Sequence, residues 1–157
     1  MYGRFPMTAF SIKLTKNQAV VKSSRLVGEK ARQWLLDFPE TIEDFPFGPD
    51  VAVYKVKGKM FATLAFGAVS RHNQASEADD KQEYRMNLKC DPQEAIMLRD
   101  VFSAVLPGYH MNKQHWNTVI LDGSLPEGEL QRMILNSYKL VVNKLPKKEQ
   151  MSLLLHL

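Results

Sequence analysis

The stretch from Glu83 to Glu94 joins a strand pattern directly to a helix start, and it constrains the fold more than any other segment. Apolar and polar residues alternate up to Cys90, which is the period of a strand with one buried face. Asp91 then suits a helix cap, Pro92 the first helical position, and Glu94 can reach back to the cap nitrogen. The alternation predicts two sets of side chains, with Tyr84, Met86, Leu88 and Cys90 inward and Arg85, Asn87 and Lys89 outward.

The flanking segments predict further strands and helices in a simple order. An apolar stripe predicts a first helix from Ser23 or Ser24 to about Phe38, although Gly28 within it costs roughly 1 kcal/mol relative to Ala. Other expected elements are an edge strand and turn at 45–49, strands at 51–56 and 60–66 joined by a hairpin, a polar loop at 67–82, a helix from 92, a strand at 116–121, a helix after a capping box at 124–127 and an amphipathic tail at 151–157. This order predicts an α+β fold, an antiparallel β-sheet with helices packed on one face.

The size and composition of the chain suit one domain. Its 157 residues can bury a core without disulfides or metal, so we expect an extension at 1–22, mobile and basic, followed by a single domain at 23–157. The one cysteine, Cys90, excludes an internal disulfide and indicates a reducing compartment. No apolar run approaches the roughly 20 residues of a membrane span. We therefore expect a cytoplasmic monomer or weak homodimer with no membrane, metal or cofactor.

Several runs of residues resemble the MmcQ/YjbR family, whose members are usually labelled DNA-binding. The resemblance covers about residue 24 to the C-terminus, and its most specific part is the run from His110 to Trp116. The other matching runs are 45–48, 55–56, 60–62, 87–90, 107–109, 117–119, 121–126 and 137–138. The resemblance implies a compact fold similar to CyaY, with two β-hairpin "wings" proposed to embrace DNA. The basic N-terminal extension and the long loop at 67–82 depart from the family pattern.

Two groups of basic residues are candidates for DNA contact. Lys55, Lys57 and Lys59 flank a hairpin tip and can contact phosphates, which require only cationic donors. Lysines on an exposed hairpin can equally serve to block edge-to-edge aggregation. The outward residues Arg85, Asn87 and Lys89 can extend the same basic surface, or can simply be the wet face of the sheet.

The run from His110 to Trp116 is a third candidate, for either of two functions. It supplies charge, hydrogen bonds and a stacking surface through His110, Asn112, Lys113, His115 and Trp116. For DNA binding we expect contacts from Lys113, His115 and Trp116. The alternative is a pocket for a small molecule or peptide formed by all five residues, in a binding protein or an enzyme. A structural role is a rival to both, with Trp116 in the core and His115 bonded to a backbone carbonyl.

Catalytic chemistry has no recognisable motif in this chain. The sequence lacks a glycine-rich phosphate loop, a nucleophile elbow and a paired-carboxylate motif. Cys90 shares its strand face with Met86 and Leu88, so we expect a buried and inert thiol. The sequence therefore predicts a non-enzymatic DNA-binding domain of low sequence selectivity, with the binding pocket as the alternative.

Overall fold

The protein is described by a computed structural model that covers residues 13–68 and 82–157. Its strands form one six-stranded sheet in the order β1-β2-β3-β4-β6-β5, and each neighbouring pair is antiparallel. The strands are β1 (Thr41–Asp44), β2 (Val51–Val56), β3 (Lys59–Ala68), β4 (Gln82–Lys89), β5 (Val105–Pro107) and β6 (Trp116–Ile120). The helices are α1 (Lys16–Leu36), α2 (Pro92–Val101), α3 (Glu127–Val142) and α4 (Lys147–Leu154).

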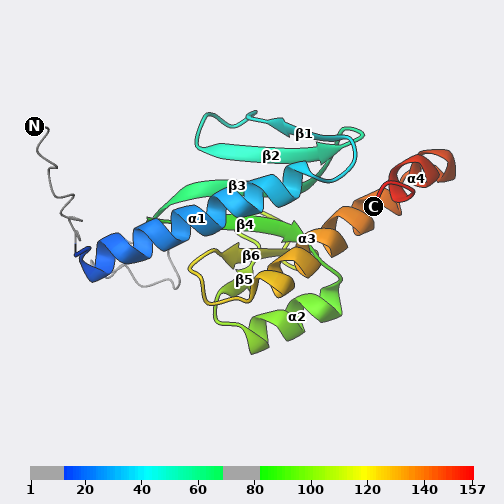
Figure 1. Cartoon of the computed structure of the whole chain (residues 1–157). Coiled ribbons are helices and arrows are strands. Elements are labelled where there is room, and N and C mark those ends of the chain that lie inside the picture. The colour runs from blue at the N-terminus through cyan, green and yellow to red at the C-terminus, as the bar shows by residue number, and fades with distance from the viewer. Residues whose placement is uncertain (1–12, 69–81) are drawn as a thin grey trace, which may run out of the picture.

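The helices lie on one side of the sheet, as expected. Figure 1 shows α1 and α3 crossing the same face and α2 on that side below them, while α4 projects beyond one end. The core forms between this helical layer and the inward side chains of the strands, including the predicted Met86 and Leu88, which are buried. The α+β fold with one helical layer is therefore confirmed.

A β-bulge shapes the end of the sheet that carries the β2–β3 hairpin. Tyr54 pairs with Ala62 but Lys55 pairs with Met60, so Phe61 is the extra residue in β3. Phe61 turns into the core with Ala62, and its ring packs edge-on against Tyr138 with centroids 5.2 Å apart. The bulge therefore removes Met60 from the inward face that simple alternation gave it.

A serine on α3 completes the hydrogen bonding at this bulge. The Ser137 hydroxyl donates to the carbonyl oxygen of Phe61 at 2.5 Å and accepts from the amide of Lys89 at 2.8 Å. Ser137 is fully buried, and the hydroxyl thus satisfies one backbone group from each of two neighbouring strands. Ser137 and the neighbouring Tyr138, which is also fully buried, therefore serve packing and buried hydrogen bonding.

The first helix and the first strand differ from the sequence expectation. Helix α1 begins at Lys16 rather than at Ser23 or Ser24, because Thr15 and Gln18 form a capping box. The last residues of the expected 1–22 extension are therefore helical, and residues 1–12 lie outside the described part. Strand β1 ends at Asp44, before the expected position, and 45–50 forms the turn. The centre of the expected 67–82 loop, residues 69–81, also lies outside the described part.

The second half differs in three places. The short strand β5 was not expected. Helix α2 has the predicted Asp91 cap, whose side chain accepts from the amides of Gln93 and Glu94. Although Val101 in the last turn of α2 is apolar and follows the helical spacing of Ala95 and Leu98, it is 69% exposed. Helix α3 is capped by Pro126 with no side-chain hydrogen bond, so the expected capping box at 124–127 is absent there. No helix within 13–68 and 82–157 is long and apolar enough to cross a membrane.

Candidate nucleic-acid interface and an apolar groove

One end of the sheet gathers lysines from four separate segments. The β2–β3 turn, the last residue of β4, the loop before β6 and the C-terminal end of α3 meet there, because Lys89 pairs with Trp116 across the ladder and its amide bonds to Ser137. We call this surface the basic end, and it comprises Lys59, Lys89, Lys113, Lys144, Lys147 and Lys148. Among the described residues, none of these six lysines forms an ion pair.

Lys89 and Lys144 come close together at the centre of the basic end. Lys89 is half-buried, and burial lowers the pKa of its ammonium group. The neighbouring charge of Lys144 lowers that pKa further. The fold thus holds two like charges together, an arrangement that an anion between them would stabilise.

The hairpin lysines do not act as one group. Lys55 Nζ lies 3.0 Å from Asp44 Oδ2, and Lys57 Nζ lies 3.0 Å from Glu40 Oε1. Both acids belong to β1 or the residue before it, which pairs alongside β2. Lys59 is exposed and has no such partner within the described chain. Of the three predicted phosphate contacts, Lys59 is therefore the best placed.

Two predicted contacts on β4 are engaged inside the protein. Asn87 is 9% exposed, accepts from the hydroxyl of Thr118 at 2.5 Å and donates to the carbonyl of Tyr109 at 3.4 Å. Arg85 lies with its guanidinium carbon 5.0 Å from the centre of the Tyr109 ring. The loop before β6 folds back over this part of the sheet, so the expected open basic row of Arg85, Asn87 and Lys89 is reduced to Lys89 at its end.

The residues from His110 to Trp116 mainly shape a turn. The His110 ring lies against Tyr109 with centroids 4.0 Å apart, and Asn112 accepts from the amide of Gln114. Trp116 is 9% exposed, so the stacking surface predicted from it is not available. None of the five residues of the predicted pocket lines the large groove described below.

Two members of this run still reach the surface. Lys113 and His115 are exposed, and their backbones are fixed: the Lys113 carbonyl accepts from Arg99, and the His115 carbonyl accepts from the amide of Cys90 at 2.8 Å. The second bond places His115 beside Lys89 at the basic end. Trp116 therefore has the structural role that the sequence left open, as a buried core residue. Lys113 and His115 remain accessible to a binding partner.

The sequence interpretation missed the C-terminal lysines of the basic end. Lys144, Lys147 and Lys148 flank Pro146 at the junction of α3 and α4. Their local density is visible in the sequence, but their proximity to Lys89 depends on the direction in which α3 crosses the sheet.

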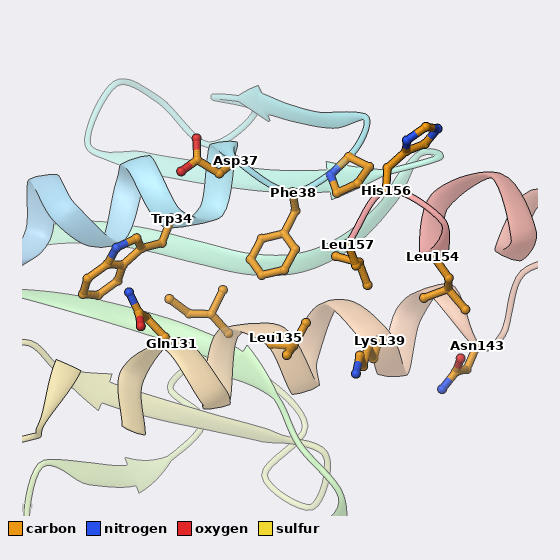
Figure 2. A pocket seen from close by; sticks show the side chains of 12 residues that line it. Trp34, Asp37, Phe38, Gln131, Leu135, Lys139, Asn143, Leu154, His156 and Leu157 are labelled. Atoms are coloured by element: carbon orange, nitrogen blue, oxygen red, sulfur yellow. The ribbon is translucent and has the colours of Figure 1, made fainter. Parts of the chain in front are cut away.

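A groove of about 900 Å³ lies on the helical side, between the C-terminal end of α1, α3 and the residues after α4. Figure 2 shows Phe38, Leu135 and Leu157 around its middle, with Trp34 toward one end and Leu154 toward the other. The remaining lining residues are Asp37, Pro39, Gln131, Ile134, Lys139, Asn143 and His156. Nothing in the sequence pattern indicated this groove, because its walls come from three distant segments.

The cysteine is placed as the sequence predicted. Cys90 is buried, and burial raises the pKa of its thiol to about 11, with the charges of Glu94 and Asp91 acting in the same direction. A thiol with this pKa is almost entirely protonated at neutral pH, which disfavours a nucleophilic role.

The sheet order and single helical layer define a small α+β domain of the kind seen in a known family. A family model described as YjbR matches residues 36–140, and the chain belongs to the YjbR family. The chain is 32% identical over 122 residues to YbdF of Escherichia coli O157:H7, covering 78% of this chain and 89% of that protein. It is 44% identical over 65 residues to YjbR of Escherichia coli K12, covering 41% and 55%.

Solved structures show the same fold. A Deinococcus radiodurans protein with a DUF419 domain superposes with a TM-score of 0.65 at 33% identity, covering 80% of this chain and 86% of that one. A Pseudomonas syringae protein superposes with a TM-score of 0.57 at 27% identity, covering 81% and 98%. The family resemblance drawn from the sequence is therefore confirmed.

Proposed function

We propose that this protein binds duplex DNA, without catalysing a reaction, through phosphate contacts from the basic end. The observation that carries the proposal is the approach of Lys144 to Lys89, two ammonium groups with no carboxylate partner in the described chain. Holding like charges together costs free energy in the free protein, and a phosphate placed between them offsets that cost.

The surrounding lysines extend this contact into a surface. Lys59 on the β2–β3 hairpin and Lys113 before β6 flank the central pair, and Lys147 and Lys148 follow it at the start of α4. The projecting β2–β3 hairpin, visible at the same end as α4 in Figure 1, would serve as one of the two wings that the family resemblance implies. Phosphate contacts carry no base information, so this surface favours binding of low sequence selectivity.

The test is a titration of the purified protein with a short DNA duplex at several salt concentrations. A double variant, Lys89→Met with Lys144→Met, should bind more weakly and flatten the slope of log K against log salt by about 1.8, or about 0.9 for each lost phosphate contact. The matched control is Lys16→Met with Lys22→Met, which removes the same charge from exposed positions in the first half of α1.

The two double variants separate a local contact from the effect of net charge. Equal losses in both would show that the total charge of the protein, rather than the basic end, governs binding. No salt-dependent binding by the wild-type protein, or a wild-type salt slope in the Lys89/Lys144 variant, would overturn the proposal. Circular dichroism of each variant would serve as the control for folding.

A further inference from the structure

The groove between α1, α3 and the C-terminal residues has walls that are fixed by specific contacts. The hydroxyl of Tyr138 donates to the carbonyl of Pro39 at 2.8 Å, which ties the end of α1 to α3. The Phe38 ring stacks on the Tyr138 ring with centroids 4.7 Å apart. Because Tyr138 is fully buried, this wall is anchored in the core and needs no ligand to form it.

The third wall is held in the same way. Leu153 on α4 is fully buried, and the side-chain amide of Gln150 donates to the carbonyls of Asn143 at 3.0 Å and Leu145 at 2.7 Å. The Asn143 carbonyl belongs to the C-cap of α3, where the helix leaves carbonyl groups unpaired, and the Leu145 carbonyl belongs to the turn that follows. Figure 2 shows Leu157 beside Phe38, with Leu154 farther along the groove toward α4.

The size and lining of the groove suit a small molecule with an apolar body. Its volume of about 900 Å³ falls within the range of roughly 300–1,000 Å³ typical of small-molecule sites. The flat rings of Trp34 and Phe38 and the aliphatic side chains of Leu135 and Leu157 all line the groove. Such surfaces bury aromatic or alicyclic rings well.

The charged side chains of the groove indicate the charge of the ligand that it would bind. Lys139 lies among the lining residues on α3, one helical turn from Leu135, and forms no ion pair within the described chain. Asp37 is the one carboxylate side chain among the residues that line the groove, and Figure 2 shows its carboxylate directed away from Phe38 and Leu157. An ammonium group beside apolar walls that forms no ion pair with a described residue is complementary to an anion.

We propose that this groove binds a small organic carboxylate, whose ring-containing apolar body lies between Trp34, Phe38 and Leu157 and whose carboxylate pairs with Lys139. His156, also in the lining, can offer a second hydrogen-bond donor through a ring N–H. The groove and the basic end share no residue, so variants of Lys139 and of the basic-end lysines test the two proposals separately.

The test is isothermal titration with three named acids, naphthalene-2-acetate, biphenyl-4-acetate and cyclohexane acetate, each compared with its neutral amide. We expect saturable binding of at least one acid and roughly tenfold weaker binding of its amide, because a charge-assisted hydrogen bond is lost. The Lys139→Met variant should bind that acid roughly tenfold more weakly and bind the amide as the wild type does. Lys139 is exposed, so this variant should fold normally.

The matched control is Lys144→Met, which removes the same charge from the same helix end outside the groove lining. It should bind the acid like the wild type, whereas its DNA affinity should fall. Perturbation of the Trp34 indole N–H signal in the NMR spectrum by the acid, with Trp116 unmoved, would place the ligand in the groove. The proposal is overturned if no acid binds saturably, if acid and amide bind alike, or if Lys139→Met binds the acid like the wild type.

Discussion

Gly28 of α1 lies directly against the ring of Tyr84 on β4. A Cβ atom at Gly28 would sit 2.4 Å from Cδ2 of that ring, well inside contact distance. One turn earlier in the same helix, the Ser24 hydroxyl accepts a hydrogen bond from the amide of Tyr84 at 3.2 Å. The helix thus approaches the strand closely at these two small residues, and the glycine is required by packing rather than by backbone conformation.

We therefore expect Gly28→Ala to destabilise the protein, although alanine is the better helix former by roughly 1 kcal/mol. The steric clash should outweigh that gain, giving a net loss of about 1–3 kcal/mol in the free energy of unfolding. The matched change is Gly128→Ala in α3, where a Cβ would meet nothing within 4 Å. That variant should be at least as stable as the wild type in urea unfolding, and a stabilised Gly28→Ala would contradict the packing role.

Glu43 makes stability depend on acid pH. Its carboxylate accepts two hydrogen bonds from Arg32, both at 2.8 Å, and one from the Tyr54 hydroxyl at 2.7 Å. The bonds from Arg32 are the largest cause of a lowered pKa for Glu43 in the folded protein. Because the unfolded carboxyl takes up its proton more readily, this stabilisation is complete above the unfolded pKa of about 4.3 and is lost as the pH falls through the folded value.

Glu43→Gln should accordingly lower the free energy of unfolding by about 2 kcal/mol at pH 7 and by much less at pH 3. The comparison variant is Glu127→Gln, whose partner Lys30 and own side chain are each 54% exposed. Exposed ion pairs contribute little to stability, so the free energy of unfolding of this variant should match that of the wild type at both pH 7 and pH 3. If Glu43→Gln lowered the free energy of unfolding equally at pH 3 and pH 7, the charge of the Glu43 carboxylate would not be the source of the stabilisation.

Lys89 predicts a pH effect on DNA binding in the alkaline range. Its lowered pKa means that the free protein begins to lose this proton below the ordinary lysine value of about 10.4. A bound phosphate favours the charged form, so binding should take up a proton and weaken as the pH rises toward that value. Lys89→Arg stays charged throughout and should blunt this loss in titrations at constant ionic strength. A wild-type pH response in Lys89→Arg would place Lys89 outside the interface.

Cys90 should react with thiol reagents only when the protein opens. Its pKa of about 11 and its burial keep it protonated and covered in the native state. Labelling should therefore be slow in buffer and fast in denaturant, and Cys90→Ala should leave DNA affinity unchanged. Rapid labelling of the native protein would show that the thiol is accessible and would reopen a chemical role.

The parts of the fold that the sequence predicted are those with a complete local signal. The alternating pattern and the Asp91 cap lie within one short stretch, and the strand β4 and the capped helix α2 that they predict are both observed. Strand β5 has only three residues, too few to show a period. The start of α1 was placed late because its first turns show no sustained apolar period in the sequence, so the cap at Thr15 is the signal that marks them.

The candidate site was less predictable because the exposure and charge pairing of its residues depend on partners that are distant in the sequence. Lys55 and Lys57 form ion pairs with Asp44 and Glu40. The pairing of β1 with β2 brings these acids alongside the lysines. Asn87 follows the outward alternation correctly, yet a folded-back loop and Thr118 bury it. The groove beside Lys139 forms only where three segments of the chain come together, and no local sequence pattern indicates such long-range contacts.

The hydroxyl of Ser137 gives one end of the sheet a dependence on helix docking. Phe61 and Lys89 belong to neighbouring strands, but the ladder between β3 and β4 begins beyond them, at Ala62 and Leu88. The link between them comes from Ser137, a residue 76 positions away from Phe61. The strands alone therefore leave a carbonyl and an amide unsatisfied until α3 arrives. Exchange of the Lys89 amide with solvent consequently reports the undocking of α3 rather than fraying between strands, and the lysine most central to the proposed DNA surface takes its final position only when that helix is in place.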